Sequence, residues 1–302
     1  PHPSGVEKMI EKYEKAGRIA FEVLQECKQL IKPGAKLLEI AETAERKIAE
    51  KGAKPAFPPN ISINEIAAHF TPEKDSTSTI GEKDIVKLDI GVHIDGFIGD
   101  NALTVDLSNE NGKLVEAAEK ALDAAICSIH AGAKLGDIGA EVEVAIKGFG
   151  FKPIENLTGH ALGEYNLHAG VEIPNIANKD PNQLQEGMVL AIEPFATNGE
   201  GRVSEAPQVE IFSLLEPLPV RMRESRRLLN YVEENFKTLP FAERWLYKDF
   251  HSKLLLHAAL RELVFSGALK QYPVLKDAGK GIVSQAELTV VVEKDAARVL
   301  TK

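Results

Sequence analysis

Residues 84–105 constrain the fold more than any other stretch of the chain, because two β-branched runs meet there at Asp95-Gly96. An Asp-Gly pair between two such runs is typical of a β-hairpin turn. Asp89 and Asp100 lie 11 residues apart across this turn. Because side chains alternate between the two faces of a strand, both carboxylates point to the same face whichever of the neighbouring residue pairs forms the turn.

Two acids on one face of a hairpin need an explanation, because Asp is disfavoured inside strands and is rarely buried without a partner. Apolar residues surround both positions, including Leu88, Ile90 and Ala102. A divalent cation between the carboxylates is one interpretation, since carboxylate oxygens are preferred ligands of hard metal ions. The alternative is an edge hairpin whose aspartates face water. The hairpin alone leaves both interpretations open.

Much of the chain before residue 113 has a counterpart after it. Each copy contains two amphipathic segments and a β-run, and the matching stretches are 34–40 with 132–138, 51–62 with 147–158, and 84–89 with 188–193. The offsets of 98, 96 and 104 residues differ only by the length of a loop. Asp89 and Glu193 occupy equivalent positions, so a pseudo-twofold repeat would bring two acidic strands to one central site.

A helical insertion interrupts the second copy. Strand-like sequence gives way near Glu216-Pro-Leu-Pro219 to helical periodicity, and strand character resumes at 281–292. That later run contains Glu287, which is equivalent in position to Asp100. The sequence therefore predicts an α+β fold with an internal repeat and one insertion. The expected division is a main domain at 6–213, completed by 274–302, and an inserted helical subdomain at 214–273.

Composition excludes several classes of function. The chain has 302 residues, 44% of them hydrophobic, and no run approaches the ~18 apolar residues of a membrane span, so no membrane partner is expected. A net charge of −9 argues against binding nucleic acid over the whole surface, and no sequence-specific nucleic-acid partner is expected. Cys27 and Cys127 are too few for a disulfide framework, which favours a reducing cytoplasm.

Three of the eight histidines occur where neither helical nor strand periodicity explains them. They are His69, in Ala-Ala-His-Phe, and His160 and His168, which share the segment 156–170. A single histidine is usually structural or solvated, and His93 at the hairpin tip is interpreted as at most a weak ligand.

Taken in order, Asp89, Asp100, His160, Glu193 and Glu287 resemble the five metal ligands of the methionine aminopeptidases, the family with the pita-bread fold. Local motifs carry the same resemblance, namely Pro55-Ala-Phe-Pro, Ser62-Ile-Asn-Glu, Ala67-Ala-His69, Leu88-Asp-Ile-Gly-Val-His-Ile-Asp-Gly, Gly159-His160, Leu167-His-Ala-Gly, Ala191-Ile-Glu-Pro-Phe-Ala-Thr197 and Gln285-Ala-Glu287.

The insertion, with Leu239-Pro-Phe-Ala-Glu-Arg-Trp-Leu, is similar to the helical subdomain of type II members of that family. The lack of a long charged N-terminal extension resembles the archaeal members. Two positions depart from the family pattern, because Asn101 stands where Thr is usual and Leu288 where His is expected. Neither departure removes a ligand, although Leu288 takes away one expected support of Glu287.

The resemblance implies a metalloexopeptidase that removes the initiator methionine from nascent proteins when the second residue is small, by attack of a hydroxide shared by two metal ions on the first peptide bond. Four carboxylates and one imidazole favour two divalent ions, of Co, Mn, Fe or Zn, because four negative charges at one point would otherwise repel one another. By analogy, Asp89 would chelate one ion, His160 and Glu193 the other, and Asp100 and Glu287 would bridge them.

The resemblance also implies roles for residues around the metals. Glu193 is the expected proton shuttle between the attacking water and the leaving amine. His69 and His168 are expected to hydrogen-bond the substrate and the developing oxyanion. Three residues are expected to line a narrow pocket for the methionine side chain, namely Phe57, Leu167 and Phe195. The alternative is that they only pack in the core.

The expected partners are the N-termini of nascent polypeptides, with the ribosome as a further candidate, and the expected state is a cytoplasmic monomer.

Two alternative functions share the fold. An aminopeptidase P or prolidase cuts before proline, but such enzymes generally carry a separate N-terminal domain. A non-catalytic relative that binds ribosomes or nucleic acid would have lost its ligands, whereas here all five are present.

Overall fold

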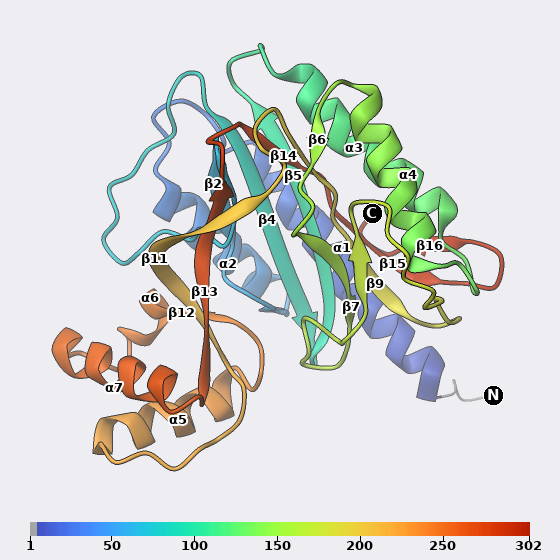
Figure 1. Cartoon of the computed structure of the whole chain (residues 1–302). Coiled ribbons are helices and arrows are strands. Elements are labelled where there is room, and N and C mark those ends of the chain that lie inside the picture. The colour runs from blue at the N-terminus through green and yellow to red at the C-terminus, as the bar shows by residue number, and fades with distance from the viewer. Residues whose placement is uncertain (1–4) are drawn as a thin grey trace.

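The structure is a computed structural model that describes residues 5–302. A long hairpin of β4 (Ile85–Ile94) and β5 (Phe97–Asp106) runs through its centre (Figure 1). The turn residues Asp95 and Gly96 both have positive φ, 49° and 89°, as a type I′ turn requires. Asp89 pairs with Ala102 and Asp100 pairs with Gly91, so both carboxylates lie on one face. The predicted hairpin is confirmed.

The N-terminal half packs two helices against this hairpin. They are α1 (Gly5–Lys28) and α2 (Leu37–Glu50), and the short strands that follow are β1 (Lys54–Pro55), β2 (Asn60–Ile63) and β3 (Ile66–Ala68). Helix α1 crosses β5 where two glycines meet, and a Cβ at Gly99 would lie 2.5 Å from the backbone of Gly17. A larger residue at Gly99 would push the helix off the sheet, and one at Gly17 would meet the carbonyl oxygen of Leu300 at 2.4 Å.

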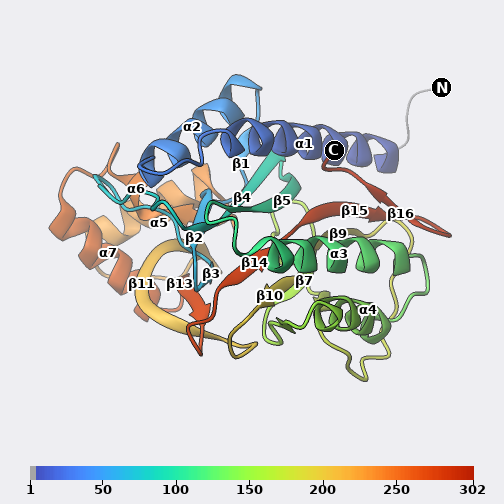
Figure 2. The ribbon, with the colours of Figure 1, turned by 90° about the horizontal axis from the view of Figure 1, so that it is seen from above.

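The second half repeats the arrangement with a helix pair on the opposite side of the strands (Figure 2). The helices are α3 (Gly112–Ser128) and α4 (Leu135–Gly148), and the strands are β6 (Lys152–Pro153), β7 (Thr158–Leu162), β8 (Glu172–Pro174), β9 (Val189–Ile192), β10 (Phe195–Thr197), β14 (Val283–Gln285), β15 (Leu288–Val292) and β16 (Ala297–Val299). The two halves join where Ala102 and Glu287 exchange backbone hydrogen bonds of 3.3 and 3.0 Å.

The sequence predicts one continuous strand at 281–292, but the structure divides it into β14 and β15. Strand β14 pairs with β10 and β15 pairs with β9, and these partners are themselves separated at Glu193-Pro194. Proline cannot donate a ladder hydrogen bond, so the sheet breaks at that level in both neighbouring strands. Glu193 and Glu287 both lie at this break.

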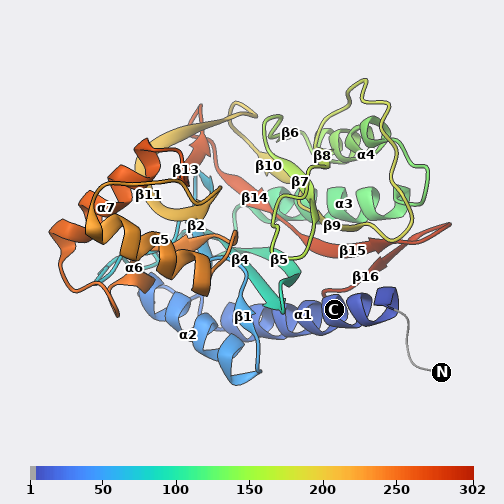
Figure 3. The same ribbon diagram turned by 90° about the horizontal axis from the view of Figure 1, so that it is seen from below.

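Strands β11 (Val203–Leu214) and β13 (Leu269–Asp277) pair with each other, and the inserted segment lies between them. It contains α5 (Arg223–Asn235), β12 (Phe241–Ala242), α6 (Glu243–Leu246) and α7 (Lys253–Phe265), which gather at one end of the molecule in Figure 3. The helices have a core of their own, including Leu228, Phe241 and Leu260. The expected boundary at residue 273 falls inside β13, so this strand serves both parts.

The insertion is also held against α2. The Arg244 side chain, only 5% exposed, pairs with Glu45 at 2.5 Å, and the Trp245 Nε1–H donates to the same carboxylate at 2.8 Å. Burial of the guanidinium makes this pairing necessary rather than incidental. No helix in residues 5–302 combines the length and apolar character needed to cross a membrane.

Candidate active site

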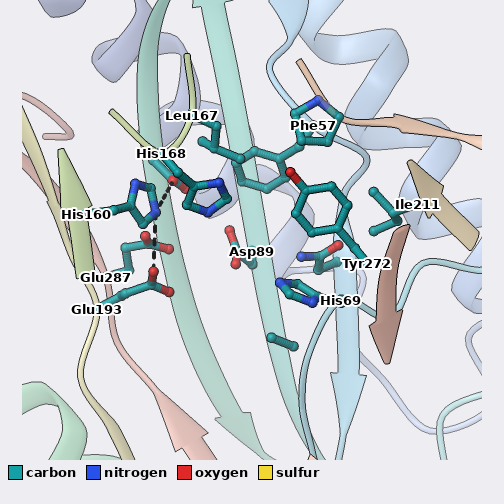
Figure 4. Close-up of a pocket in the computed structure, with 14 residues that line it drawn as sticks. Phe57, His69, Asp89, His160, Leu167, His168, Glu193, Ile211, Tyr272 and Glu287 are labelled. Carbon is teal, nitrogen blue, oxygen red and sulfur yellow. Dashed lines mark ion pairs between the residues drawn. The ribbon is translucent and has the colours of Figure 1, made fainter. Parts of the chain in front are cut away.

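Five side chains converge on the central cavity, three from strands β4, β5 and β7 and two, Glu193 and Glu287, from the strand break (Figure 4). His160 Nε2 lies 3.3 Å from Glu193 Oε1 and 3.8 Å from Asp100 Oδ2. Suitable ligand atoms of Asp100, His160 and Glu287 all lie within 4.8 Å of one another. The structure therefore brings together all five residues predicted as ligands.

Gln285 connects two of the acids, a role that the sequence analysis did not assign. Its Nε2 lies 3.3 Å from both Asp89 Oδ2 and Glu193 Oε2 and donates to them. The residue appears in the Gln285-Ala-Glu287 motif, but its amide reaches Glu193 through the pairing of β14 with β10 and reaches Asp89 through the contact of β14 with β4. An amide can donate without adding charge, so Gln285 orients two carboxylates in a crowded acidic site.

The acids are buried and destabilise one another as anions. Desolvation, together with repulsion from neighbouring carboxylates, raises the pKa values of Asp89, Asp100 and Glu287 well above their ordinary range. Desolvation also raises the pKa of Glu193 to about 8. Burial lowers the pKa of His160 to about 4, which keeps its imidazole neutral and able to bind a metal ion.

Unpartnered oxygens show what these acids lack. Within residues 5–302, Asp89 Oδ1, Asp100 Oδ1 and both carboxylate oxygens of Glu287 are buried without a hydrogen-bond partner. Buried acceptors are normally paired, and buried carboxylates need a compensating cation. Four carboxylates and a neutral imidazole form a donor set suited to divalent metal ions. The residues present therefore fit a metal centre.

His69 and Tyr272 lie across the cavity from His160, Glu193 and Glu287, whereas His168 lies beside His160 (Figure 4). His69 has a left-handed φ of 65°, and its Nδ1 lies 3.2 Å from the carbonyl oxygen of Pro273. A carbonyl can only accept, so Nδ1 carries the hydrogen and Nε2 of the neutral ring presents a lone pair. Desolvation lowers the pKa of His69 to about 4 and also lowers that of His168, which is the more exposed of the two.

The cavity has a volume of about 60 Å³, and Phe57 and Leu167 are among the residues that line it. The ring of Phe57 lies over Gly91, where a Cβ would come within 2.1 Å of it. Side chains that the sequence analysis did not assign complete the wall, including Ile211 of β11, Pro240 of the insertion and Tyr272 of β13. Their contribution depends on long-range strand pairing and on the insertion, which no local motif encodes.

The prediction for Phe195 is wrong. This residue does not line the cavity but packs in a separate core with Ala67, Ile154 and Val283. Alternation along an unbroken strand would place it on the same face as Glu193. Because the strand is interrupted at Pro194, that alternation is lost and the ring turns into the core.

Comparison with known proteins agrees with this geometry. The model of metallopeptidase family M24 matches residues 11–212. The methionine aminopeptidase of Thermococcus kodakarensis is 51% identical over 95% of this chain and 97% of its own length, and that of Archaeoglobus fulgidus is 51% identical over 98% of both. The chain belongs to the methionine aminopeptidases of family M24. The resemblance expected from the motifs is therefore confirmed.

Solved structures confirm the pita-bread fold of this methionine aminopeptidase family member. A methionine aminopeptidase from Thermotoga maritima has a TM-score of 0.72 at 23% identity and covers 100% of this chain and 99% of its own. A thermophilic Arx1 has a TM-score of 0.85 at 19% identity, covering 97% and 90%. The prolidase from Pyrococcus furiosus, at a TM-score of 0.62, is matched over only 64% of its length.

The two departures from the family pattern have different consequences in this methionine aminopeptidase. The Asn101 side-chain amide donates to the carbonyl of Ile90 at 3.0 Å, so the residue braces the hairpin. Leu288 pairs with Ile192 across β15 and β9 and offers no polar group to Glu287. His93 is not part of the acid cluster, because its Nδ1 accepts a hydrogen bond of 3.0 Å from the Gly96 amide.

The loop that carries Leu167 and His168 is anchored at Tyr165. The Tyr165 amide donates to the Gly96 carbonyl at 2.8 Å, and the Thr238 hydroxyl donates to the Tyr165 carbonyl. Lys237 Nζ lies 4.1 Å from the centre of the Tyr165 ring. The hairpin tip and the insertion thus hold this loop from both sides.

The raised pKa values predict how the metal-free protein responds to pH. Between 4.5, the ordinary value for Glu, and about 8 for Glu193, the folded state keeps protons that the unfolded state has released. The free energy of unfolding therefore falls as pH rises through that window. We expect the Tm of metal-free protein to drop by at least ~2 °C between pH 5 and pH 8 because of these acids, as measured by calorimetry.

Metal-loaded protein is the matched control for this titration, because bound cations favour ionised ligands and remove the penalty. Its Tm should change less over the same range. Parallel curves with and without metal would show that the acids do not carry the pH dependence.

Proposed function

We propose that this chain removes the N-terminal methionine from newly made polypeptides, with divalent metal held by Asp89, Asp100, His160, Glu193 and Glu287. The observation that carries the proposal is a small cavity with buried, unpartnered carboxylate oxygens on one side and the apolar Phe57 and Leu167 on another. Relatives that align over nearly the whole chain are methionine aminopeptidases. When bound, divalent ions supply an acidified water that can attack an amide.

Two ions account best for the charge of the site, because four carboxylates carry four negative charges and two divalent cations balance them. Asp89 would hold one ion, His160 and Glu193 the other, and Asp100 and Glu287 would lie between them. Mn, Fe, Co and Zn all suit carboxylate and imidazole ligands.

Glu193 is the proposed proton carrier. Its carboxylate lies beside His160 and lines the cavity. Gln285 donates a hydrogen bond to Oε2 of this carboxylate and thereby orients it. It takes a proton from the attacking water and delivers it to the leaving amine. Among residues 5–302, the carboxylates that line this cavity are those of the four acidic ligands, so the proton carrier is one of them.

His69 and His168 are proposed to hydrogen-bond different groups of the substrate. His69 presents an Nε2 lone pair, so it accepts from the amide N–H of the substrate rather than donating to an oxyanion. His168 is the ring available to donate to the developing oxyanion, and it lies close to the metal ligands, with its centroid 4.6 Å from that of His160.

The proposed setting is the cytoplasm, where nascent chains appear. Cys27 and Cys127 are free, as a reducing compartment allows. We assign nascent N-termini as the substrates, the ribosome as the particle that presents them, and a monomer as the working unit.

Peptide selectivity tests the proposal. Rates on Met-Ala-, Met-Lys- and Ile-Ala-headed peptides should differ, with Met-Ala at least ~10-fold ahead of the others, because a flexible Met fits beside Phe57 and Leu167 whereas β-branched Ile clashes near its Cβ. A small second residue passes the histidines and a Lys does not. Equal rates on all three would exclude this specificity. Equally fast cleavage of N-acetylated Met-Ala would exclude an exopeptidase.

A further inference from the structure

A second cavity, of about 480 Å³, adjoins the catalytic one and has no role in the proposed function. The two cavities share His69, His160, His168 and Tyr272 as lining residues. Phe57 and Leu167, by contrast, pack into an apolar cluster with Tyr13 and Leu162, which closes the other side. We call the second cavity the exit groove, lined by 156, 158, 170–172, 203, 205, 270–273 and 275 together with the shared histidines.

One wall of the exit groove is the strand segment Lys270–Pro273 of β13. Its residues pair with β11 on one edge, where Tyr272 lies opposite Ile211 and Lys270 opposite Ser213. Strand β3 reaches β13 only at Leu275 and Lys276, and no other strand within the described residues pairs with that second edge. An extended peptide can use the part of this edge before Pro273 for main-chain hydrogen bonds, because Pro273 itself has no N–H and its carbonyl already accepts from His69.

Lys270 lines the exit groove together with His69 and His168. Its Nζ lies 4.7 Å from the centre of the Tyr272 ring, and that ring contacts both His69 and His168. The Lys270 charge contributes to lowering the pKa of His69 and of His168. No ion pair engages Lys270 anywhere in the part of the chain that the structure describes. Its ammonium group is therefore available to a ligand.

We propose that the exit groove binds the substrate polypeptide from its third residue onward, and that Lys270 makes an acidic side chain favoured at the third position. This inference rests on the proposed aminopeptidase function. With the first side chain in the catalytic cavity and the second beside His69 and His168, the next residue lies along β13. There Lys270 is the one Lys or Arg among the described residues that line the groove, beside the acids Glu172 and Glu205.

Matched pentapeptides test the inference. Met-Ala-Xaa-Gly-Gly is compared with Xaa as Asp, Asn or Lys, and kcat/KM is measured for metal-loaded enzyme. Lys270 attracts an Asp and repels a Lys at the third position, and both interactions are exposed to solvent. We therefore expect kcat/KM for the Asp peptide to exceed that for the Lys peptide by ~3–10-fold, with the Asn peptide between them. Lys270→Glu should invert the order, and Lys270→Gln should bring the three rates together. Ratios within one variant cancel any general change in its activity.

Lys276→Glu is the matched control, because it makes the same charge change on the same strand outside the groove, and it should keep the wild-type order. Calorimetric binding of the same three peptides with a reduced, uncleavable first bond repeats the comparison without turnover. Equal wild-type rates and affinities for Asp and Lys peptides, or an order unchanged in Lys270→Glu, would overturn the inference. Failure to cleave Met-Ala amide would instead count against the proposed function, and the binding series would still decide on the groove.

Discussion

Replacing Glu193 by Gln is expected to lower kcat/KM for Met-Ala-headed peptides by at least ~10²-fold while divalent metal stays bound. Gln keeps an oxygen that can ligate, but it can neither accept a proton from water nor pass one to the leaving amine. Steady-state kinetics measures the rate, and elemental analysis of the dialysed protein measures the metal. Because the loss belongs to a proton-transfer step, it should appear mainly in kcat rather than in KM.

Glu116→Gln removes the same charge from an exposed position on α3 and serves as the control, with activity expected to equal that of the wild type. A Glu193→Gln enzyme that retained its metal and worked within threefold of the wild-type rate would assign the proton transfer to another group. Loss of metal together with activity would show that Gln cannot replace the ligand, and the proton role would then be unsupported.

The hairpin shows how much of the site can be predicted from local sequence. The Asp95-Gly96 turn fixes the register of β4 on β5, and that register alone places Asp89 and Asp100 on one face. The repeated pattern then relates Glu193 to Asp89, and the family motifs supply His160 and Glu287. Each of these inferences uses residues within one strand, one turn or one repeat.

Residues that the sequence analysis missed share a different property. Gln285, Ile211 and Tyr272 reach the site only because distant strands pair, as when β14 aligns with β10 and β13 with β11. The register between such strands is set by the packed whole and not by neighbouring residues. Phe195, which the family resemblance led us to expect at the cavity, packs in a separate core because Pro194 interrupts the strand that carries it.

The insertion affects the site more directly than its helical sequence suggests. Pro240 lines the catalytic cavity, and Lys237 and Thr238 contact Tyr165 on the loop that carries His168. Arg244 and Trp245 fix the same segment to α2. The inserted subdomain therefore has its own core but also forms part of the active-site wall. Substitutions in it can alter the cavity without replacing a metal ligand.

Removal of divalent metal should abolish hydrolysis completely, and this is the largest effect that the structure predicts. Without cations, desolvation and mutual repulsion keep the pKa values of Asp89, Asp100 and Glu287 raised, so the site holds protons where it should hold ions. It then has no means of acidifying a water molecule near pH 7. Treatment with a chelator followed by dialysis, with Met-Ala cleavage as the assay, measures the loss.

Adding back Mn, Fe, Co or Zn, one at a time, should restore activity, and circular dichroism before and after chelation separates loss of metal from loss of fold. Protons should be released as metal binds, because ligation requires ionised carboxylates, and calorimetry in buffers of different ionisation enthalpy detects that release. Saturation at two ions per chain would support a dinuclear centre, and saturation at one would rule it out. Full activity in protein shown by elemental analysis to contain no divalent metal would mean that the carboxylates serve another chemistry.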